Sequence, residues 1–415
     1  MSRHDDPIMT IRVWTDGRGS GLLGPNGVRG TAFAYNAEAG PADAVSITMP
    51  VRLASWDSDF GLAPIFEMNL PEGALRERLR MAFAKATGTF DDIDLLAIVG
   101  RSQVGRLRYT DEHASLDQTV PFQSVDELLA SRRDGSLFQY LLERFAAYSG
   151  VSGVQPKLLI RDDVAWGEQP KAGERTSIQG ATHIVKFWED QYPQLAANEF
   201  FCLKAAERCG LPVPRFQLSE DGRALVIDRF DLRSDGRYRG FEDFCVLNAR
   251  GTAEKYRGSY ETAVLKRFRE FASPDQIANG SETIFRMLAL NAALRNGDAH
   301  LKNFGIVYDD IEGEVALAPV YDIVTTTAYI SADQMALTLD GSTRWPTAKQ
   351  LLTFGTTRQI GSPAGIKAML ESIAEAVFET MGELRQYMQA TSEFDEIGTR
   401  MLAQWDEGIR TSLVE

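Results

Sequence analysis

Cysteine is scarce in this chain, and long apolar runs are missing. Only Cys202, Cys209 and Cys245 occur in 415 residues, with no CxxC pair, so the sequence offers no zinc-binding framework and suits a reducing compartment. No stretch is long and apolar enough to cross a bilayer, and the start of the chain lacks an apolar run behind a basic patch. We therefore expect a cytoplasmic protein without membrane contact.

The sequence also lacks a surplus of positive charge. It contains 44 Lys and Arg against 58 Asp and Glu, which gives a formal net charge of −14. Affinity for duplex DNA depends largely on neutralising phosphates, so an acidic body does not bind DNA by itself. We expect any contact with DNA to run through a basic partner.

The overall amino-acid composition is that of a large folded protein. With 44% hydrophobic and 25% charged residues, a chain of this length favours two to three structural units. Residues 9–35 alternate apolar and polar positions between glycines, which predicts short strands and turns. These glycines form no GxGxxG motif that opens a helix, so hairpin turns are the better interpretation.

The pattern along the chain predicts three parts: an N-terminal module at 1–110, a middle part at 111–232 and a mainly helical part at 233–415. In the first part, the acids of Asp91–Asp94 predict the start of a buried helix that continues through Val99. Further helices are expected over Leu195–Arg208, Ile284–Arg295, Ile366–Val377, Met381–Met388 and Ile397–Trp405.

One polar loop carries the residue types that phosphoryl transfer from ATP requires. The stretch Asn296–Asn303 reads NGDAHLKN, and Asp322 follows as a lone acid in an apolar setting. The reaction needs an acid that orients the acceptor hydroxyl, and oxygen ligands for Mg²⁺. Asp298 can supply the first, and Asn303 with Asp322 the second. Protein kinases separate their catalytic Asp and metal-binding Asn by the same five residues.

The likeness of this loop to the kinase motif is incomplete. Arg295-Asn296-Gly297 precedes Asp298, so the usual His-Arg-Asp is absent. A polar loop in which Asp and Asn serve turn chemistry is the alternative. His300 and Lys302 in the same loop are candidate ATP contacts.

A second stretch, residues 149–160, has the sequence SGVSGVQPKLLI. Its glycines could let the backbone of Ser152, Gly153 and Val154 approach a phosphate, with Lys157 nearby. A glycine-rich turn into an edge strand explains the same pattern without a ligand.

The next strand, Thr182–Trp188, alternates apolar residues around Lys186. A kinase needs such a lysine for the α- and β-phosphates, held by a Glu on the following helix, where Glu199 is placed. The alternatives are a lysine whose ammonium reaches water at a strand end and an ordinary solvated carboxylate. His183, in the same strand, is expected to be structural.

The buried strand that begins at Ala224 ends in Arg229-Phe230-Asp231. In a two-lobed kinase the hinge would fall here, with backbone groups pairing with adenine and Asp231 accepting from the ribose. A strand end whose polar groups are already satisfied is the competing interpretation.

Taken together and in this order, these motifs resemble the HipA family of serine/threonine kinases, the toxins of bacterial HipBA-type modules. The resemblance covers nearly the whole chain and includes segments of the N-terminal module. The segments that carry it are residues 13–14, 69–73, 94–96, 152–157, 183–186, 227–231, 298–303 and 319–322.

The resemblance implies an α+β, two-lobed protein-kinase-like fold with a small N-terminal β-rich module. Residues 111–232 would form the N-lobe, and 233–415 the mainly helical C-lobe. Lys186 would hold ATP phosphates, Asp298 would be the catalytic acid or base, and Asn303 and Asp322 would bind Mg²⁺. Family members act on translation proteins, including aminoacyl-tRNA synthetases, and are restrained by a helix-turn-helix antitoxin of HipB type that binds DNA.

The sequence departs from the family at Gly150, which stands where the family often has an autophosphorylated serine. We predict Ser152 as the main autophosphorylation site and Ser149 as a secondary one. Two other classes of function stay open. One is a small-molecule phosphotransferase, and the other is an ATP-binding co-repressor scaffold without kinase activity.

Overall fold

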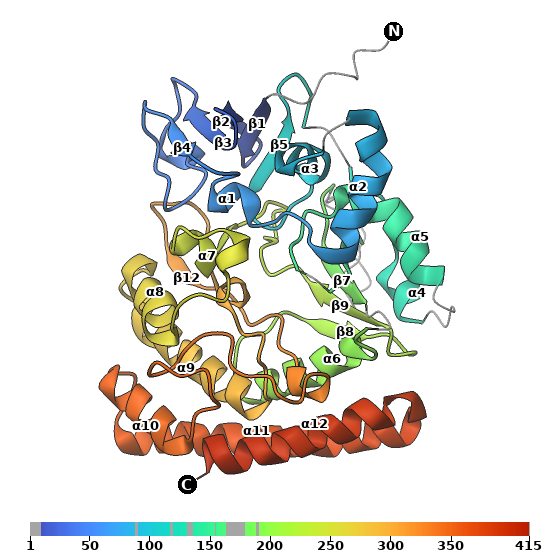
Figure 1. The fold of residues 1–415 in the computed structure, drawn as a ribbon, viewed down its shortest axis with the longest axis vertical. Coiled ribbons are helices and arrows are strands. Elements are labelled where there is room, and N and C mark those ends of the chain that lie inside the picture. The colour runs from blue at the N-terminus through green and yellow to red at the C-terminus, as the bar shows by residue number, and fades with distance from the viewer. Residues whose placement is uncertain are drawn as a thin grey trace. The chain divides into compact units, whose positions relative to one another are not determined.

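The computed structural model describes residues 10–87, 90–116, 119–130, 136–153, 155–162, 179–187 and 191–414. The chain divides into two compact units, each built from several segments (Figure 1). Unit 1 comprises Met1–Phe187, Ser219–Thr252 and Val307–Glu314. Unit 2 comprises Trp188–Leu218, Ala253–Ile306 and Val315–Glu415.

Unit 1 begins with a five-stranded sheet in the order β4-β3-β2-β1-β5, in which neighbouring strands run antiparallel. In β1 the buried positions alternate, so that Ile11, Val13 and Thr15 share the covered face. The β-rich N-terminal module predicted from the sequence is confirmed. The strands are β1 Ile11–Thr15, β2 Arg18–Asn26, β3 Gly30–Tyr35, β4 Trp56–Ser58 and β5 Leu107–Asp111.

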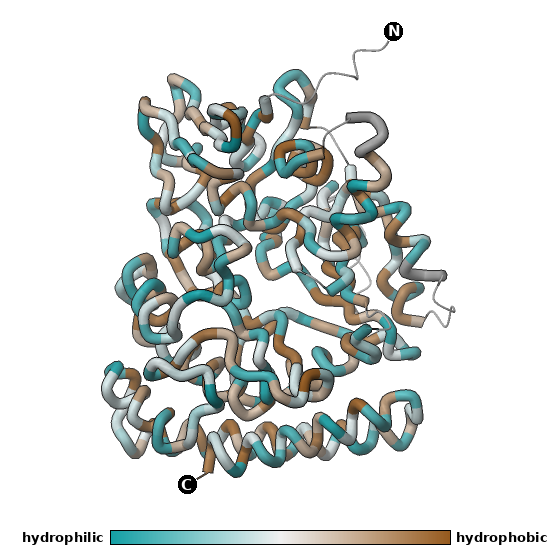
Figure 2. The backbone as a smooth tube through the Cα atoms, in the orientation of Figure 1, coloured by the Kyte–Doolittle hydropathy of each residue, from teal (hydrophilic) through white to brown (hydrophobic). Residues whose placement is uncertain are grey.

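Three helices accompany this sheet: α1 Pro64–Glu67, α2 Gly73–Thr87 and α3 Asp92–Val99. The Asp91 carboxylate accepts hydrogen bonds from the backbone N–H groups of Ile93 (2.9 Å) and Asp94 (3.0 Å). Asp94 in turn accepts from the Asp91 N–H (3.1 Å), which completes a capping box. The predicted acidic start of this buried helix is confirmed, and Figure 2 shows α3 as strongly hydrophobic.

The rest of unit 1 contains a second antiparallel sheet in which β7 lies between β6 and β9. Lys186 of β7 is paired directly with Lys157 of β6. The elements are α4 Val125–Leu129, α5 Ser136–Phe145, β6 Lys157–Ile160, β7 His183–Phe187, β9 Ala224–Asp228, β10 Gly240–Asp243 and α7 Phe244–Leu247.

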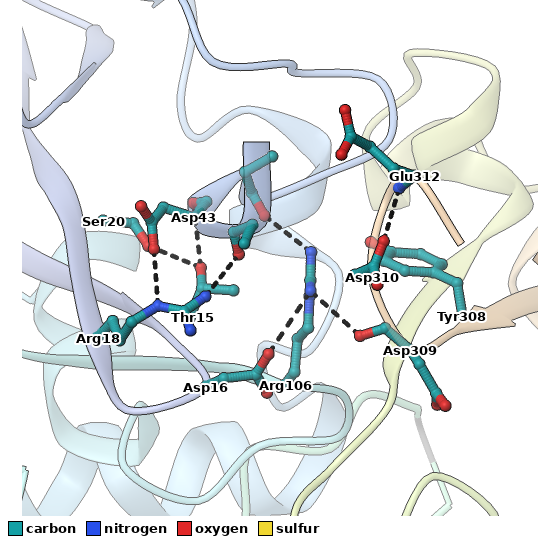
Figure 3. Close-up of polar contacts among 12 residues, drawn as sticks. Thr15, Asp16, Arg18, Ser20, Asp43, Arg106, Tyr308, Asp309, Asp310 and Glu312 are labelled. Atoms are coloured by element: carbon teal, nitrogen blue, oxygen red, sulfur yellow. Dashed lines mark hydrogen bonds and ion pairs between the residues drawn. The ribbon is translucent and has the colours of Figure 1, made fainter. Parts of the chain in front are cut away.

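Arg106 joins distant segments of unit 1 (Figure 3). Its guanidinium donates to the carbonyl oxygens of Ala44 (2.9 Å) and Asp309 (3.4 Å), and lies 3.6 Å from the Asp16 carboxylate. The same group lies over the ring of Tyr308 at 5.1 Å. Residues 307–314 are therefore held to the N-terminal module by one buried cation.

Unit 2 is mainly helical, and its longest helix, α11, contacts α6, α9, α10 and α12. Figure 2 shows hydrophilic and hydrophobic segments alternating along α11 and α12, as expected for helices with one buried face. The elements are α6 Leu195–Arg208, β8 Phe216–Leu218, α8 Arg267–Phe271, α9 Ile277–Ala293, β12 Val315–Leu317, α10 Ala348–Thr357, α11 Pro363–Ala390 and α12 Asp395–Gly408. Strand β11, Gly305–Tyr308, contains the boundary between the units.

Helix α11 corrects the prediction of two helices over Ile366–Val377 and Met381–Met388. The intervening Phe378-Glu379-Thr380 contains neither proline nor glycine, so nothing interrupts the helix. Among the helices that the structure describes, none has a stretch both long enough and apolar enough to span a bilayer.

Thr325 links α6 and α12 to the chain that follows Asp322. The Trp405 indole N–H of α12 donates to the Thr325 hydroxyl at 2.6 Å. Asn198 of α6 accepts from the Thr325 N–H (2.8 Å) and donates to its carbonyl oxygen (3.1 Å). All three residues are fully buried, so these bonds have no competition from water.

We expect Asn198→Ala to lower the free energy of unfolding by about 2–3 kcal/mol, because it leaves both backbone groups of Thr325 unpaired in the core. Urea unfolding followed by tryptophan fluorescence measures the change. Asn279→Ala, the same substitution on an exposed face of α9, is the control and should stay within about 0.5 kcal/mol of wild type. Equal midpoints for Asn198→Ala and wild type would contradict this role.

Candidate functional site

The polar loop Asn296–Asn303 follows α9 and is fixed by its own amide side chains. Buried Asn296 donates to the Asn291 side chain at 2.8 Å and accepts from the Asp298 N–H at 3.1 Å. The Gly297 N–H donates to the Thr326 hydroxyl at 2.8 Å. The loop is therefore held on the N-terminal side of Asp298 by hydrogen bonds within the protein.

Gly297 is required at its position. A Cβ built there would lie 2.6 Å from the backbone carbonyl oxygen of Gln334, which cannot move aside as a flexible side chain could. The residue before Asp298 therefore has to be glycine, which explains why the loop departs from the His-Arg-Asp pattern.

Asn303 lies beside Asp322 in unit 2, as the sequence analysis predicted. Its side-chain amide donates to the Asp322 carbonyl oxygen (3.3 Å), while its oxygen accepts from the His300 N–H (3.2 Å). The chain returns to this point because the Ala318 N–H pairs with the Gly305 carbonyl oxygen (2.9 Å). Asp322 adopts a left-handed backbone conformation, with φ of +55°, which is uncommon for a residue other than glycine.

The oxygen atoms of Asn303 and Asp322 fit a magnesium site. Mg²⁺ usually takes one or two protein ligands and completes its shell with water and substrate phosphates. Within the described residues, no group of three or more His, Cys, Asp and Glu side chains is arranged to hold a metal. The side-chain oxygens of Asn303 and Asp322 are of the type that Mg²⁺ accepts when it binds together with a nucleotide.

Asp298 is half-buried, and its environment alters its acidity. Burial raises the pKa of the Asp298 carboxyl, and the nearby Asp322 and Asp333 act in the same direction. The Tyr256 hydroxyl, which donates to Asp298 Oδ1 at 2.6 Å, and the Lys255 ammonium lower that pKa. A carboxylate with a raised pKa is a better proton acceptor than an ordinary aspartate.

His300 is buried and electrically neutral in this environment. Burial, assisted by the positive charge of Lys255, lowers the pKa of its imidazole to about 3. Its Nε2 lies 3.8 Å from Asp298 Oδ1, and its buried Nδ1 has no hydrogen-bond partner among the described residues. Lys302, next in the loop, is half-buried, and its carbonyl oxygen accepts from the Tyr321 hydroxyl at 2.9 Å.

In unit 1, Lys157 and Lys186 stand opposite each other on neighbouring strands and therefore point to the same face of the sheet. Both are buried, with 5% and 3% exposure. The alternative that Lys186 reaches water at a strand end is therefore wrong. Glu199 is fully buried within α6 of unit 2, so the alternative of a solvated carboxylate is wrong as well.

The glycine-rich stretch approaches Lys157 closely. Gly153 has a φ of +125°, which favours glycine, and a Cβ built on this residue would lie 2.4 Å from the Lys157 Nζ. The Ser152 hydroxyl, half-buried, donates to Glu72 at 2.5 Å. Val154, also predicted to approach the phosphate, lies outside the described residues.

Ser149 has a structural role in the observed conformation. It is fully buried, its hydroxyl donates to the Phe145 carbonyl oxygen (2.8 Å), and it accepts from the Leu159 N–H (2.9 Å). A phosphate could reach this hydroxyl only after the segment had opened. Of the two predicted autophosphorylation sites, Ser152 has the more accessible hydroxyl.

The charged side chains at the strand end Arg229–Asp231 form hydrogen bonds with other groups of the protein. Arg229 donates to both Asp231 oxygens, at 3.0 and 2.5 Å, and Asp231 also accepts from the Gly105 N–H at 2.6 Å. Both side chains are fully buried, while Phe230 packs edge-on against Phe241 at 5.3 Å. A ribose contact by Asp231 would have to displace one of these bonds, and this geometry favours the satisfied strand end.

Sequence reasoning missed two contacts at the predicted site residues, Tyr256 with Asp298 and Glu72 with Ser152. The partners are separated by 42 and 80 residues along the chain. Tyr256 stands in no motif, and Glu72 stands in the segment 69–73 far from the glycine-rich stretch, so no spacing in the sequence indicated either contact.

Two protein families match this chain. The HipA N-terminal domain matches residues 11–110, and the HipA-like C-terminal domain matches residues 149–381. Among curated proteins, the chain is similar to "Putative kinase Y4dM" of Sinorhizobium fredii, with 26% identity covering 98% of this chain and 94% of that protein. "Putative kinase Y4mE" of the same organism is 28% identical and covers 78% of each chain. These matches support a kinase-type phosphotransferase.

Among solved structures, the chain is similar to one from the Shewanella oneidensis MR-1 toxin–antitoxin complex of HipA, HipB and operator DNA. The TM-score is 0.63 at 19% identity, and the match covers 97% of this chain and 100% of that one. At this identity the likeness concerns the fold alone. It confirms the predicted α+β, kinase-like fold class with a β-rich N-terminal module and a helical C-terminal lobe.

We expect the imidazole of His300 to stay neutral in the metal-free protein down to roughly pH 4, since burial holds its pKa well below the usual value of about 6.5. The unfolded chain takes up this proton first, so the His300 contribution to stability falls as pH drops below about 6.5. NMR titration of the histidine ring signals measures the protonation of His300. The His300 signal is the one that is lost in His300→Gln and kept in the control variant His113→Gln. A midpoint near pH 6.5 for His300 would contradict the prediction.

Proposed function

Because the chain belongs to the HipA family, we propose that it is an ATP- and Mg²⁺-dependent serine/threonine protein kinase, the toxin of a type II toxin–antitoxin module. One observation carries the proposal. A half-buried acid, Asp298, shares a preformed loop with Asn303, and the amide of Asn303 bonds to the backbone of Asp322. This arrangement supports an acid for the acceptor hydroxyl and two oxygen donors for Mg²⁺ within unit 2.

Asp298 orients the acceptor hydroxyl and takes its proton as the phosphoryl group moves to the acceptor oxygen. Its raised pKa suits this role, because the carboxylate must accept a proton during the reaction. Asn303 and Asp322 hold Mg²⁺ through side-chain oxygens. When bound, the ion would offset the negative charge of the phosphates. His300 is neutral and adds no charge beside the ion and the phosphates, whereas Lys302 contributes a positive charge there.

Lys186 and Lys157 bind the ATP phosphates from the sheet of unit 1, together with the backbone of Ser152, Gly153 and Val154. Two buried ammonium groups on one sheet face favour an anionic ligand there. Glu199 is the proposed partner of Lys186. The segment Arg229–Asp231 would lie near the adenine, through its backbone and Phe230, since its two charged side chains already bond to each other.

Autophosphorylation is proposed at Ser152, with Ser149 as the secondary site. A phosphate on Ser152 would add about −1.5 to −2 charge beside the Glu72 carboxylate that now accepts its hydrogen bond. That repulsion would expel the segment from its present position and separate it from Lys157.

The three-part division at 1–110, 111–232 and 233–415 is likewise proposed.

The proposed partners are a HipB-type helix-turn-helix antitoxin and a translation protein, such as an aminoacyl-tRNA synthetase, as substrate. DNA would be reached only through the antitoxin. The net charge of −14 supports this, because an acidic protein lacks the cations that hold duplex DNA. The solved relative from Shewanella, which is a complex of HipA, HipB and operator DNA, supports the same arrangement.

Asp298→Asn should reduce phosphate transfer to serine and threonine residues by about 10²–10⁴-fold, because the amide cannot take the acceptor proton. Nucleotide binding should be largely retained. The measurement is transfer from radiolabelled ATP to proteins of a cell extract, with the modified residues located by mass spectrometry. Asp340→Asn, at an exposed turn of unit 2, is the matched control and should transfer at the wild-type rate. Undiminished transfer by Asp298→Asn would refute the assignment.

A further inference from the structure

Tyr256 contacts the reactive carboxylate in a way that the proposed roles leave unexplained. Its hydroxyl donates to Asp298 Oδ1 at 2.6 Å. A general base has to approach the hydroxyl that it deprotonates to about 2.6–3.2 Å. The Tyr256 hydroxyl therefore already lies at Oδ1 at the distance that the hydroxyl of an acceptor would take there.

The Tyr256 side chain can leave this position without disturbing the loop. It is 51% exposed, although it is a large aromatic residue. Its neighbours are anchored through the backbone, because the Lys255 carbonyl oxygen accepts from the Leu301 N–H (3.1 Å) and the Arg257 N–H donates to Glu254 (2.9 Å). Rotation about the side-chain bonds of Tyr256 would free the carboxylate and leave these backbone bonds intact.

Tyr260, four residues further on, shows what a purely structural tyrosine looks like in this segment. It is 1% exposed, and its hydroxyl donates to the backbone carbonyl oxygen of Ala299 at 2.9 Å. Tyr260 thus supports the backbone of the loop from inside the core. Tyr256 instead bonds to the functional group of the loop from a half-exposed position, with its ring edge-on to His300 at 5.0 Å.

The loop does not need Tyr256 to keep its shape. The Asp298 N–H is held by Asn296, and the Asp298 carbonyl oxygen accepts from the His300 N–H at 2.7 Å. The bond from Tyr256 adds no further backbone restraint. Its effect falls on the carboxylate, where a second hydroxyl that approaches Oδ1 would compete with it.

We propose that Tyr256 occupies the acceptor position of Asp298 in the empty enzyme, and that an incoming hydroxyl must displace it. This inference rests on the proposed kinase function. A specific protein substrate has a large contact surface with which to displace the side chain, whereas water has none. Tyr256 therefore suppresses the transfer of phosphate from ATP to water while no substrate is bound.

The test is the rate of Mg²⁺-ATP hydrolysis by the full-length protein without a protein acceptor. Tyr256→Phe keeps the ring but removes the competing hydroxyl, so hydrolysis should rise by about tenfold, the effect of losing one hydrogen bond to a charged group. Tyr140→Phe is the matched control, because Tyr140 is also exposed and its hydroxyl is hydrogen-bonded, in that case to Arg144. That variant should hydrolyse ATP at the wild-type rate.

The double variant Tyr256→Phe with Asp298→Asn should lose the gain, since the tyrosine acts only through that carboxylate. A hydrolysis rate for Tyr256→Phe that is unchanged or lower than wild type would overturn the inference. The kinase proposal would survive that result if wild-type transfer to protein still depended on Asp298. Transfer that is indifferent to Asp298→Asn would instead overturn the kinase proposal itself.

Discussion

Three buried asparagine side chains hold the candidate site together, and the remaining geometry of unit 2 depends on them. Asn296 fixes the start of the loop, Asn303 joins the loop to Asp322, and Asn198 holds the chain at Thr325. Each amide donates one hydrogen bond and accepts another, which a carboxylate at the same position could not do. Neutral amides therefore make these structural bonds on both sides of the two acids, Asp298 and Asp322.

The two units accommodate their charged side chains in different ways. In unit 1, Arg229 and Asp231 bond to each other and to backbone groups, and Lys157 stands opposite Lys186 on the neighbouring strand. In unit 2, Asp298 stays half-exposed and is covered by an exposed tyrosine. Burial costs free energy for every charge, so the buried Arg229 and Asp231 need each other as partners, whereas Asp298 keeps contact with solvent.

The sequence predicted those features that depend on local spacing. Asp298 and Asn303 stand five residues apart, so their place in one loop could be foreseen. Burial distinguished between the interpretations of Lys186 and Glu199, which the strand and helix patterns alone left open. The bonds from Tyr256, Glu72 and Gly105 could not be predicted, because they join residues 42, 80 and 126 positions apart. Such contacts arise only from tertiary packing.

The most direct test of the account is whether Asn303 and Asp322 bind the metal together with the nucleotide. Calorimetry with a non-hydrolysable ATP analogue, with and without Mg²⁺, gives the affinity gained from the ion. Wild-type protein should gain at least about tenfold, since a carboxylate ligand is the main protein contribution to such sites. Asp322→Asn should lose most of that gain while keeping its metal-free affinity. An equal gain in both proteins would contradict the account.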